Sequence, residues 1–86
     1  MVHFTHHAIK RIRQRGISDE MIYLVLEFGD YVKDKVILNS KKLNQLIKRI
    51  KETDLKSKLL KILDKGGLIV VLSEDDILIT AYNCNK

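Results

Sequence analysis

The first thirty residues of the chain show the apolar spacing and the end signals of two helices. Residues 6–15 predict one helix, which the Thr5 side chain caps and which Gly16 ends, because glycine readily takes the left-handed conformation wanted there. Ser18 caps the second helix, whose first turn holds two acids and which closes at Gly29. Its apolar residues cover most of the circumference, a pattern typical of a buried helix.

Residues 30–65 are expected to form a strand or short hairpin and then two helices. The run "DYVKDKVILN" reads as extended chain, with Asp34 and Lys35 as a plausible turn. Ser40 is the expected cap of an amphipathic helix, whose apolar residues are spaced i, i+3, i+4 and i+7: Leu43, Leu46, Ile47 and Ile50. A turn signal at residues 53–54 opens the next helix, and the glycines at 66–67 stop it.

Two short apolar runs at the end of the chain predict an antiparallel hairpin. They read "LIVVLS" and "ILITAYN", and the acids at residues 74–76 join them. The first run lacks polar alternation, so we expect it to be buried on both faces. The whole pattern predicts an α+β fold. Two N-terminal helices pack on a small antiparallel sheet of about four strands, and a basic helical pair is inserted before the C-terminal hairpin.

Length and composition limit the chain to one small domain over residues 1–86. Hydrophobic residues make up 45% and charged residues 31%, enough for a core and for a hydrated surface. The single Cys84 excludes an internal disulfide and a cysteine zinc cluster, which fits a reducing cytoplasm. The sequence shows neither a signal peptide nor a membrane-spanning run, so we expect a soluble cytoplasmic protein with no membrane partner.

The net charge of +5 is concentrated in two separated segments. Residues 1–17 hold four basic residues and no acid, and residues 40–65 hold nine basic residues against three acids. Such blocks can form one surface for phosphates or attract an acidic protein partner. The nucleic-acid-binding residues expected in them are Arg13, Lys41, Lys42, Lys48 and Arg49. In the second segment, lysines that merely hydrate amphipathic helices explain the pattern equally well.

The stretch "FTHHAIKRIRQRGIS" is the main candidate for chemistry. On a helix, His7, Arg11 and Arg15 lie at i, i+4 and i+8 and share one side. An imidazole can move a proton near neutral pH, and guanidinium groups bind phosphate and stabilise developing negative charge. An ordinary polar helix edge gives the same spacing. A metal site at His3, His6 and His7 is disfavoured, because adjacent helical side chains point about 100° apart.

Thr80 and Tyr82 lie two residues apart in the last expected strand and so face the same way, together with Leu78 and Cys84. They offer a pair of hydroxyls and a ring on which a base can stack. Residues of these types also form plain cross-strand packing pairs. The strand therefore indicates a functional site only in combination with the N-terminal helix.

Both ends of the chain resemble the short bacterial, archaeal and phage proteins grouped as domain of unknown function 4258. That family begins with an aromatic-Thr-x-His-Ala element, followed by Arg and then by Arg-Gly-Ile-Ser. The matching positions here are Phe4, Thr5, His7, Ala8, Arg11, Arg15, Gly16, Ile17 and Ser18. Its last strand resembles "ILITAYN", where Thr80 and Tyr82 match, whereas residues 40–65 look less typical.

The resemblance implies the fold group that unites barnase, the EndoU nucleases, the colicin tRNases and RelE-like toxins. In these metal-independent ribonucleases, N-terminal helices pack on a four-stranded antiparallel sheet. The catalytic set implied by that likeness is His7, Arg11 and Arg15, facing the strand that carries Thr80 and Tyr82. His7 would act as general base or acid, the two arginines would stabilise the phosphorane, and Tyr82 would orient the nucleophile or stack a base.

We therefore expect a ribonuclease-like domain that cleaves RNA by attack of the 2′-hydroxyl, with no metal or other cofactor. It would be the toxin of a toxin–antitoxin pair or a mobile-element protein, and its partners would be RNA and an acidic antitoxin. One alternative is a non-catalytic module that binds nucleic acid or an acidic protein through the same basic surface. Another is a structural or assembly protein of a phage or mobile element.

Overall fold

The computed structural model describes residues 2–84, and its helices and strands alternate in pairs along the chain. This order, with a four-stranded sheet, confirms the α+β fold expected from the sequence. The helices are α1 (His6–Gln14), α2 (Asp19–Phe28), α3 (Ser40–Arg49) and α4 (Thr53–Asp64). The strands are β1 (Asp30–Val32), β2 (Lys35–Asn39), β3 (Gly67–Leu72) and β4 (Leu78–Asn83).

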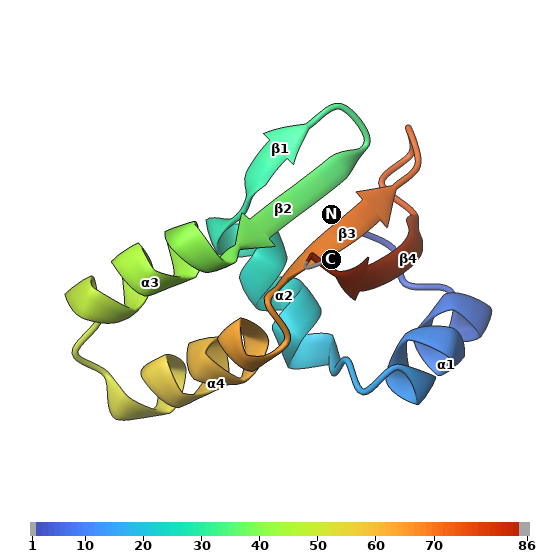
Figure 1. Ribbon diagram of the computed structural model, residues 1–86. Helices are drawn as coiled ribbons and strands as arrows, with labels where there is room; N and C mark the ends of the chain where they lie inside the picture. The colour runs from blue at the N-terminus through green and yellow to red at the C-terminus, as the bar shows by residue number, and fades with distance from the viewer. Residues whose placement is uncertain (1, 85–86) are drawn as a thin grey trace.

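The strands form one antiparallel sheet in the order β1-β2-β3-β4 (Figure 1). β1 has only three residues and is one edge strand of the sheet, with no further strand beside it in residues 2–84. The segment before α1 pairs with the opposite edge, beside β4. There the His3 amide donates to the carbonyl of Asp76, and the Leu78 amide donates to the carbonyl of His3, both at 2.8 Å. These two bonds bring the start of α1 to the start of β4.

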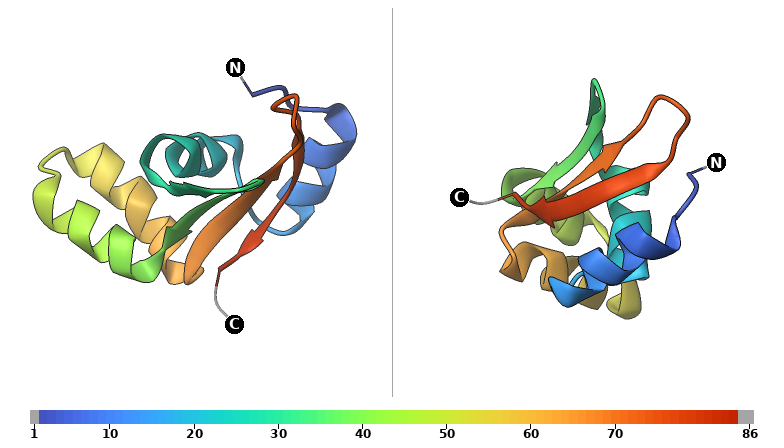
Figure 2. Two further views of the ribbon diagram at one scale, coloured as in Figure 1. Left: turned by 90° about the horizontal axis from the view of Figure 1, so that it is seen from above. Right: turned by 90° about the vertical axis from the view of Figure 1, so that its right-hand side faces the viewer.

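α2 lies on one face of the sheet, α1 lies along its β4 edge, and α3 and α4 lie where β2 ends and β3 begins (Figures 1 and 2). α2 packs on β2 and β3, while α3 and α4 pack on each other and on β2 and β3 respectively. α1 packs along β4, the edge strand on the other side of the sheet. The two N-terminal helices therefore do not sit side by side on the sheet, since α2 covers its face and α1 flanks its edge. Within residues 2–84, no helix lies on the face that Figure 1 turns toward the viewer.

The expected ends of the first two helices are confirmed by their caps. The Thr5 side chain accepts the Ala8 amide, and the Ser18 side chain accepts the Met21 amide, each at 3.2 Å. Gly16 follows α1 with a φ of 78°, the left-handed conformation expected of it.

The cap of α3 differs from the expectation by one residue. Asn39 caps this helix, because its side chain accepts the Lys42 amide at 2.9 Å, and Ser40 is the first helical residue instead. Either residue type can cap a helix. Asn39 does so because it is also the last residue of β2, where it pairs with Gly67. The end of the strand therefore fixes the start of the helix.

Two turns of the sheet also correct the sequence expectations. The β1–β2 turn is made by Lys33 and Asp34, with Lys33 at a φ of 59°, whereas Lys35 already belongs to β2. Between β3 and β4 the register shifts at Val71 and Leu72. This irregularity turns Leu78 into the core, so it does not share a face with Thr80 and Tyr82 as the simple alternation predicted.

The core lies between the sheet and the helices and contains side chains from every helix. On β3, Leu68, Val70 and Leu72 are buried, but Ile69 and Val71 on the other face are only partly buried. The expectation that this strand is buried on both faces was therefore wrong, because only one face of the sheet carries helices. The fully buried residues with the largest side chains are Ile12, Ile17, Ile22, Leu38, Leu43, Leu59, Ile62, Leu68 and Leu78.

Within the described chain, no helix is long and apolar enough to cross a bilayer.

Candidate nucleic-acid interface

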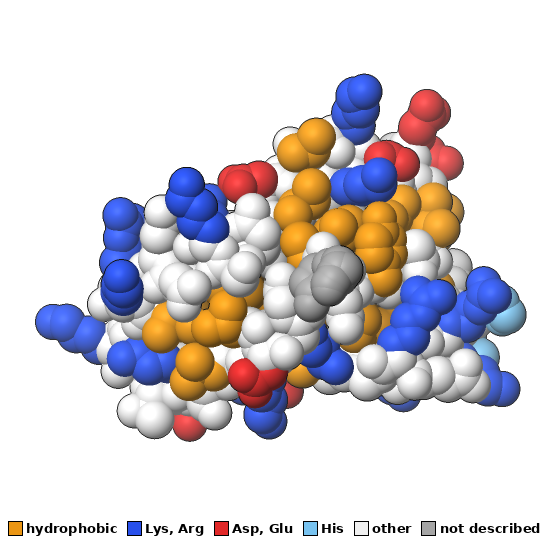
Figure 3. Space-filling view, viewed as in Figure 1, with side chains coloured by type: hydrophobic (Ala, Val, Ile, Leu, Met, Phe, Trp, Pro, Cys, Tyr) orange, Lys and Arg blue, Asp and Glu red, His pale blue; other side chains and the backbone are white. Residues whose placement is uncertain are grey.

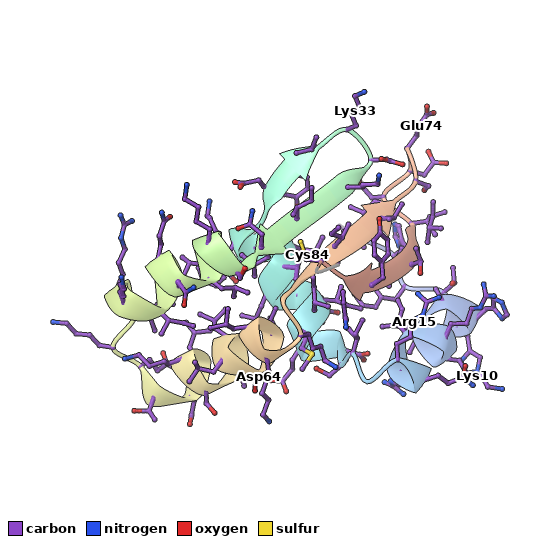
Figure 4. The ribbon with its side chains drawn as sticks, viewed as in Figure 1. Lys10, Arg15, Lys33, Asp64, Glu74 and Cys84 are labelled. Atoms are coloured by element: carbon purple, nitrogen blue, oxygen red, sulfur yellow. The ribbon has the colours of Figure 1, made fainter. Side chains whose placement is uncertain are left out.

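Helix α1 is fastened to β4 by an apolar contact and by one arginine. Ala8 and Ile12 are buried on the side of α1 that packs on the sheet. At the end of the helix, Nη1 of Arg15 donates to Oγ1 of Thr80 at 3.0 Å and to the carbonyl oxygen of Ala81 at 2.9 Å. Figure 4 shows Arg15 between α1 and β4, whereas Lys10 points away from the sheet. The contact joins two of the expected catalytic residues, Arg15 and Thr80.

The stripe of His7, Arg11 and Arg15 runs obliquely across α1. Each step of four residues advances about 40° beyond a full helical turn. Arg15 lies next to the buried side of the helix, Arg11 is turned farther out, and His7 farther still. All three side chains are exposed. The stripe therefore starts in solvent at His7 and ends against β4 at Arg15, about 12 Å farther along the helix axis.

Tyr82 lies at the Arg15 end of this edge and not at the His7 end. The start of α1 is held near Leu78 by the pairing of His3, and its last turn is held at Thr80 and Ala81. Tyr82 follows these residues along β4, beyond the Arg15 contact. The structure thus brings Arg15, Thr80 and Tyr82 to one place and leaves His7 nearer the beginning of β4.

The uncovered face of the sheet carries two rows of side chains in register across all four strands. One row is Asp30, Ile37, Ile69 and Tyr82, and the other is Val32, Lys35, Val71 and Thr80. We call these eight residues the open face. Ile37, Ile69, Val71 and Tyr82 are partly exposed and are absent from the hydrophobic core. Figure 3 shows hydrophobic side chains gathered here, with Lys and Arg side chains to either side over α1 and α3.

The basic residues of α3 lie where β2 ends, whereas α1 lies along the β4 edge (Figure 1). Lys41, Lys48 and Arg49 are exposed, while Nζ of Lys42 contacts Oδ1 of Asp30 at 3.1 Å. Because Asp30 belongs to the open face, Lys42 borders that face. The two basic segments of the sequence therefore do not merge into one patch, since the open face lies between them (Figure 3).

Arg13 and the other histidines lie on different parts of the surface around α1. Nη2 of Arg13 pairs with Oδ2 of Asp19 at 3.0 Å. The charge of Arg13, one of the residues expected to contact phosphate, is therefore already balanced. His6 lines a shallow hollow with Ile9, Lys10, Arg13 and Gln14. In residues 2–84, no three His, Cys, Asp or Glu side chains come together as a metal site would require.

Sequence reasoning missed the open face, although the sequence carried a signal for it. In "KVILN" the polar Lys35 and Asn39 share a strand side with Ile37, which indicates that this side meets water. The run "LIVVLS" carries no such signal, because its residues are apolar on both sides. Pairing with β2 sets Ile69 beside Ile37 and so reveals which side of β3 is uncovered.

The comparisons with known proteins point to one family. The family model described as Domain of unknown function (DUF4258) matches residues 4–83. No curated protein and no solved structure matches the chain significantly. The matched range extends from the aromatic residue of the opening stretch into β4, and so includes both segments that carry the resemblance. This chain belongs to the DUF4258 family.

Proposed function

We propose that this chain is a cytoplasmic RNA-binding domain of the ribonuclease-toxin type, with the RNA lying along the edge formed by α1 and β4. The observation that supports the proposal best is the bond from Arg15 to Thr80 and Ala81. This bond holds α1 beside β4, the strand that contains Tyr82. α1 carries basic residues and no acidic residue. In the setting we propose, the chain is the toxin of a toxin–antitoxin pair or a mobile-element protein.

The positive charges along α1 suit the phosphate backbone of single-stranded RNA. Lys10 and Arg11 are exposed, and neither side chain has a carboxylate of residues 2–84 within hydrogen-bonding distance. Arg15 uses Nη1 for its contacts with β4, and its other nitrogens have no partner in residues 2–84. Phosphates contacted by these side chains would release condensed cations. Tyr82 offers a ring on which one base can stack at the end of this path.

The reaction we propose needs no metal, because the nucleophile is part of the substrate. The 2′-oxygen of a ribose attacks the adjacent phosphorus while His7 takes the hydroxyl proton. The bond from phosphorus to the 5′-oxygen breaks, and the imidazolium returns the proton to that oxygen. The products are a 2′,3′-cyclic phosphate and a 5′-hydroxyl end. Arg11, one turn from His7, stabilises the charge on the phosphorane, and Arg15 holds the neighbouring phosphate.

A second candidate is binding of RNA without cleavage, and one observation favours it. The imidazole of His7 is exposed, makes no side-chain hydrogen bond to a described residue, and stands at the far end of α1 from Tyr82. General bases are ordinarily oriented by a neighbouring group. The alternative predicts the same RNA path and salt dependence but unaltered RNA.

Incubation of the purified protein with single-stranded RNA and with DNA of the same sequence tests both candidates. Cleavage by the proposed route continues in EDTA, leaves cyclic phosphate ends and spares DNA, which lacks the 2′-hydroxyl. His7→Ala should lower the cleavage rate by roughly 10²–10⁴-fold and leave RNA affinity nearly unchanged. His6→Ala is the matched control, because this neighbouring histidine points to another side of the same helix.

Three outcomes would decide against cleavage at His7. Equal loss of activity in His6→Ala and His7→Ala would remove His7 from the reaction, and equal cutting of DNA would exclude the 2′-hydroxyl as nucleophile. If RNA binds but stays intact, the non-catalytic RNA-binding module is the correct account. For binding itself, log affinity should fall against log salt with a slope of about −0.7 per phosphate contact. Affinity that is independent of salt would contradict an RNA path along α1.

A further inference from the structure

Helix α3 is the basic element that the RNA path along α1 and β4 leaves unused. The helix contains basic residues and no acid. Its apolar side is turned inward, where Leu43 is buried and Leu46 and Ile47 pack against the core. The opposite side is exposed, and we call its side chains the polar face of α3: Lys41, Asn44, Gln45, Lys48 and Arg49.

No acid of the described chain pairs with the cations of this face. Lys42, at its border, is already paired with Asp30. Lys41, Lys48 and Arg49 form no ion pair with a carboxylate of residues 2–84. The first acid after α3 in the sequence lines a hollow between α2 and α4 instead. The positive charge of the polar face is therefore available to a ligand.

Helix α4 shows how a helix surface that is merely hydrated is composed in this chain. Its lysines alternate with two acids, Asp54 and Asp64, and Lys58 pairs with Glu20 of α2. Such a mixture of both signs is usual on hydrated surfaces. α3 has lysines without any acid, so hydration alone does not account for its composition.

The side chains of the polar face fit a phosphate backbone better than a protein or a membrane. Protein interfaces have an apolar core and few lysines, whereas nucleic-acid interfaces are polar and positively charged. The polar face has no apolar side chain, and its amides can bond to phosphate and sugar oxygens. A helix on a membrane surface inserts its apolar side, but α3 packs that side on β2 and α4.

The length of the polar face matches several successive phosphates. Lys41 and Arg49 are eight residues apart, which is about 12 Å along the helix axis. At about 3.4 Å per stacked nucleotide, this length covers about four nucleotides. The polar face and α1 lie to either side of the open face (Figure 3), in a domain whose longest extent is 33 Å. About ten stacked nucleotides therefore suffice for one RNA to reach both helices.

We propose that the polar face of α3 is a second RNA-binding surface, which holds the phosphate backbone of a segment separate from the one along α1 and β4. Its three cations contact phosphates, and its two amides bond to sugar and phosphate oxygens. That these phosphates belong to RNA rests on the proposed function. The consequence is a preference for long RNA, because a strand held at one surface meets the other at a high effective concentration.

Replacement of the three cations by glutamine, a good helix former, tests this surface. Affinity is measured over a range of salt concentrations for single-stranded RNA of about 30 nucleotides, which is long enough to reach both helices. Lys41→Gln, Lys48→Gln and Arg49→Gln together should weaken binding roughly 10–100-fold in about 0.1 M salt. The log–log salt slope should also become shallower by about 2, at about 0.7 for each lost contact.

The matched control removes three charges at exposed positions outside α1 and α3: Lys33→Gln, Lys35→Gln and Lys61→Gln. Because it loses no phosphate contact, the control should keep the salt slope of the wild type and most of its affinity. Equal weakening in the control and in the α3 variant would overturn the inference. So would equally tight binding of poly-glutamate with the same number of charges, since an acidic protein would then be the better ligand.

A variant of α1, Lys10→Gln with Arg11→Gln, separates this inference from the proposed function. If only the α1 variant loses affinity for RNA, the polar face of α3 is not an RNA-binding surface and the path along α1 stands. If only the α3 variant loses affinity, the path along α1 is wrong and the polar face of α3 stands. Loss in both variants supports two surfaces on one RNA.

Discussion

Removal of the Arg15 side chain tests whether this residue joins α1 to the sheet. Its Nη1 makes hydrogen bonds of 3.0 Å and 2.9 Å to residues that are 65 and 66 positions away in the sequence. The stem of the side chain also lies next to the buried side of α1. Alanine at this position keeps the helix but deletes both bonds. The carbonyl of the buried residue Ala81 then loses its charged donor.

The expected loss of stability follows from the two bonds. A hydrogen bond to a charged group contributes about 1.5–3 kcal/mol when it is buried, and less when water can replace it. Because Arg15 is exposed and the Thr80 hydroxyl is only partly buried, we expect Arg15→Ala to lose about 1–3 kcal/mol in total. In a domain of this size, each kcal/mol lowers the melting temperature by roughly 4–8 °C. Thr80→Val removes one acceptor and should cost about 0.5–1.5 kcal/mol.

Urea unfolding followed by circular dichroism measures these changes. The two single variants and the double variant form a cycle, whose coupling energy should be about 0.5–1.5 kcal/mol if the side chains bond to each other. Lys10→Ala is the control, since it removes a positive charge from α1 on the side away from the sheet and should change stability by less than about 0.5 kcal/mol. If Arg15→Ala and Lys10→Ala unfold at the same urea concentration, Arg15 does not fasten α1 to β4.

Two further predictions concern single positions elsewhere in the fold. Gly67 has a φ of 98°, and a Cβ there would lie 2.5 Å from the carbonyl oxygen of Leu38, so Gly67→Ala should cost at least about 2 kcal/mol in thermal unfolding. Gly16→Ala meets only the flexible end of a lysine and should cost less, about 1–2 kcal/mol; equal costs would contradict this account. The Lys58 hydrogen bond and charge lower the pKa of Glu20 below its ordinary value of 4.5. As the pH falls, Glu20 is protonated in the unfolded chain before it is protonated in the folded one. The free energy of unfolding of the wild type should therefore exceed that of Glu20→Gln above pH 4.5, and the difference should vanish in more acidic solution. A difference that stays constant across that range would refute the pairing.

The helices of this protein could be predicted from the sequence because their signals are local. Thr5 and Ser18 cap the helices that follow them, and Gly16 takes the left-handed conformation, all through contacts within a few residues. The α+β class followed from the same periodicities. At the start of α3 the sequence favoured Ser40 as the cap, but Asn39, which can cap a helix equally well, takes that role. The end of β2 made that choice.

The candidate site was only partly predictable, because its geometry joins distant parts of the chain. The sequence indicated that His7, Arg11 and Arg15 share one side of a helix, and that Thr80 and Tyr82 share one side of a strand. Only the packing of α1 on β4 determined that Arg15 meets Thr80.

The open face was decided mainly by tertiary structure, since only the alternation in "KVILN" pointed to it in the sequence. The apolar run of β3 has no polar side, so the sequence alone favoured burial on both faces. Strand pairing aligned Ile69 with Ile37 and Tyr82, and every helix took another place. On β3, Leu68, Val70 and Leu72 belong to the core, whereas Ile69 and Val71, which are equally apolar, lie on the uncovered face. Whether a side chain is buried depends on what packs against it, and that is a property of the assembled fold.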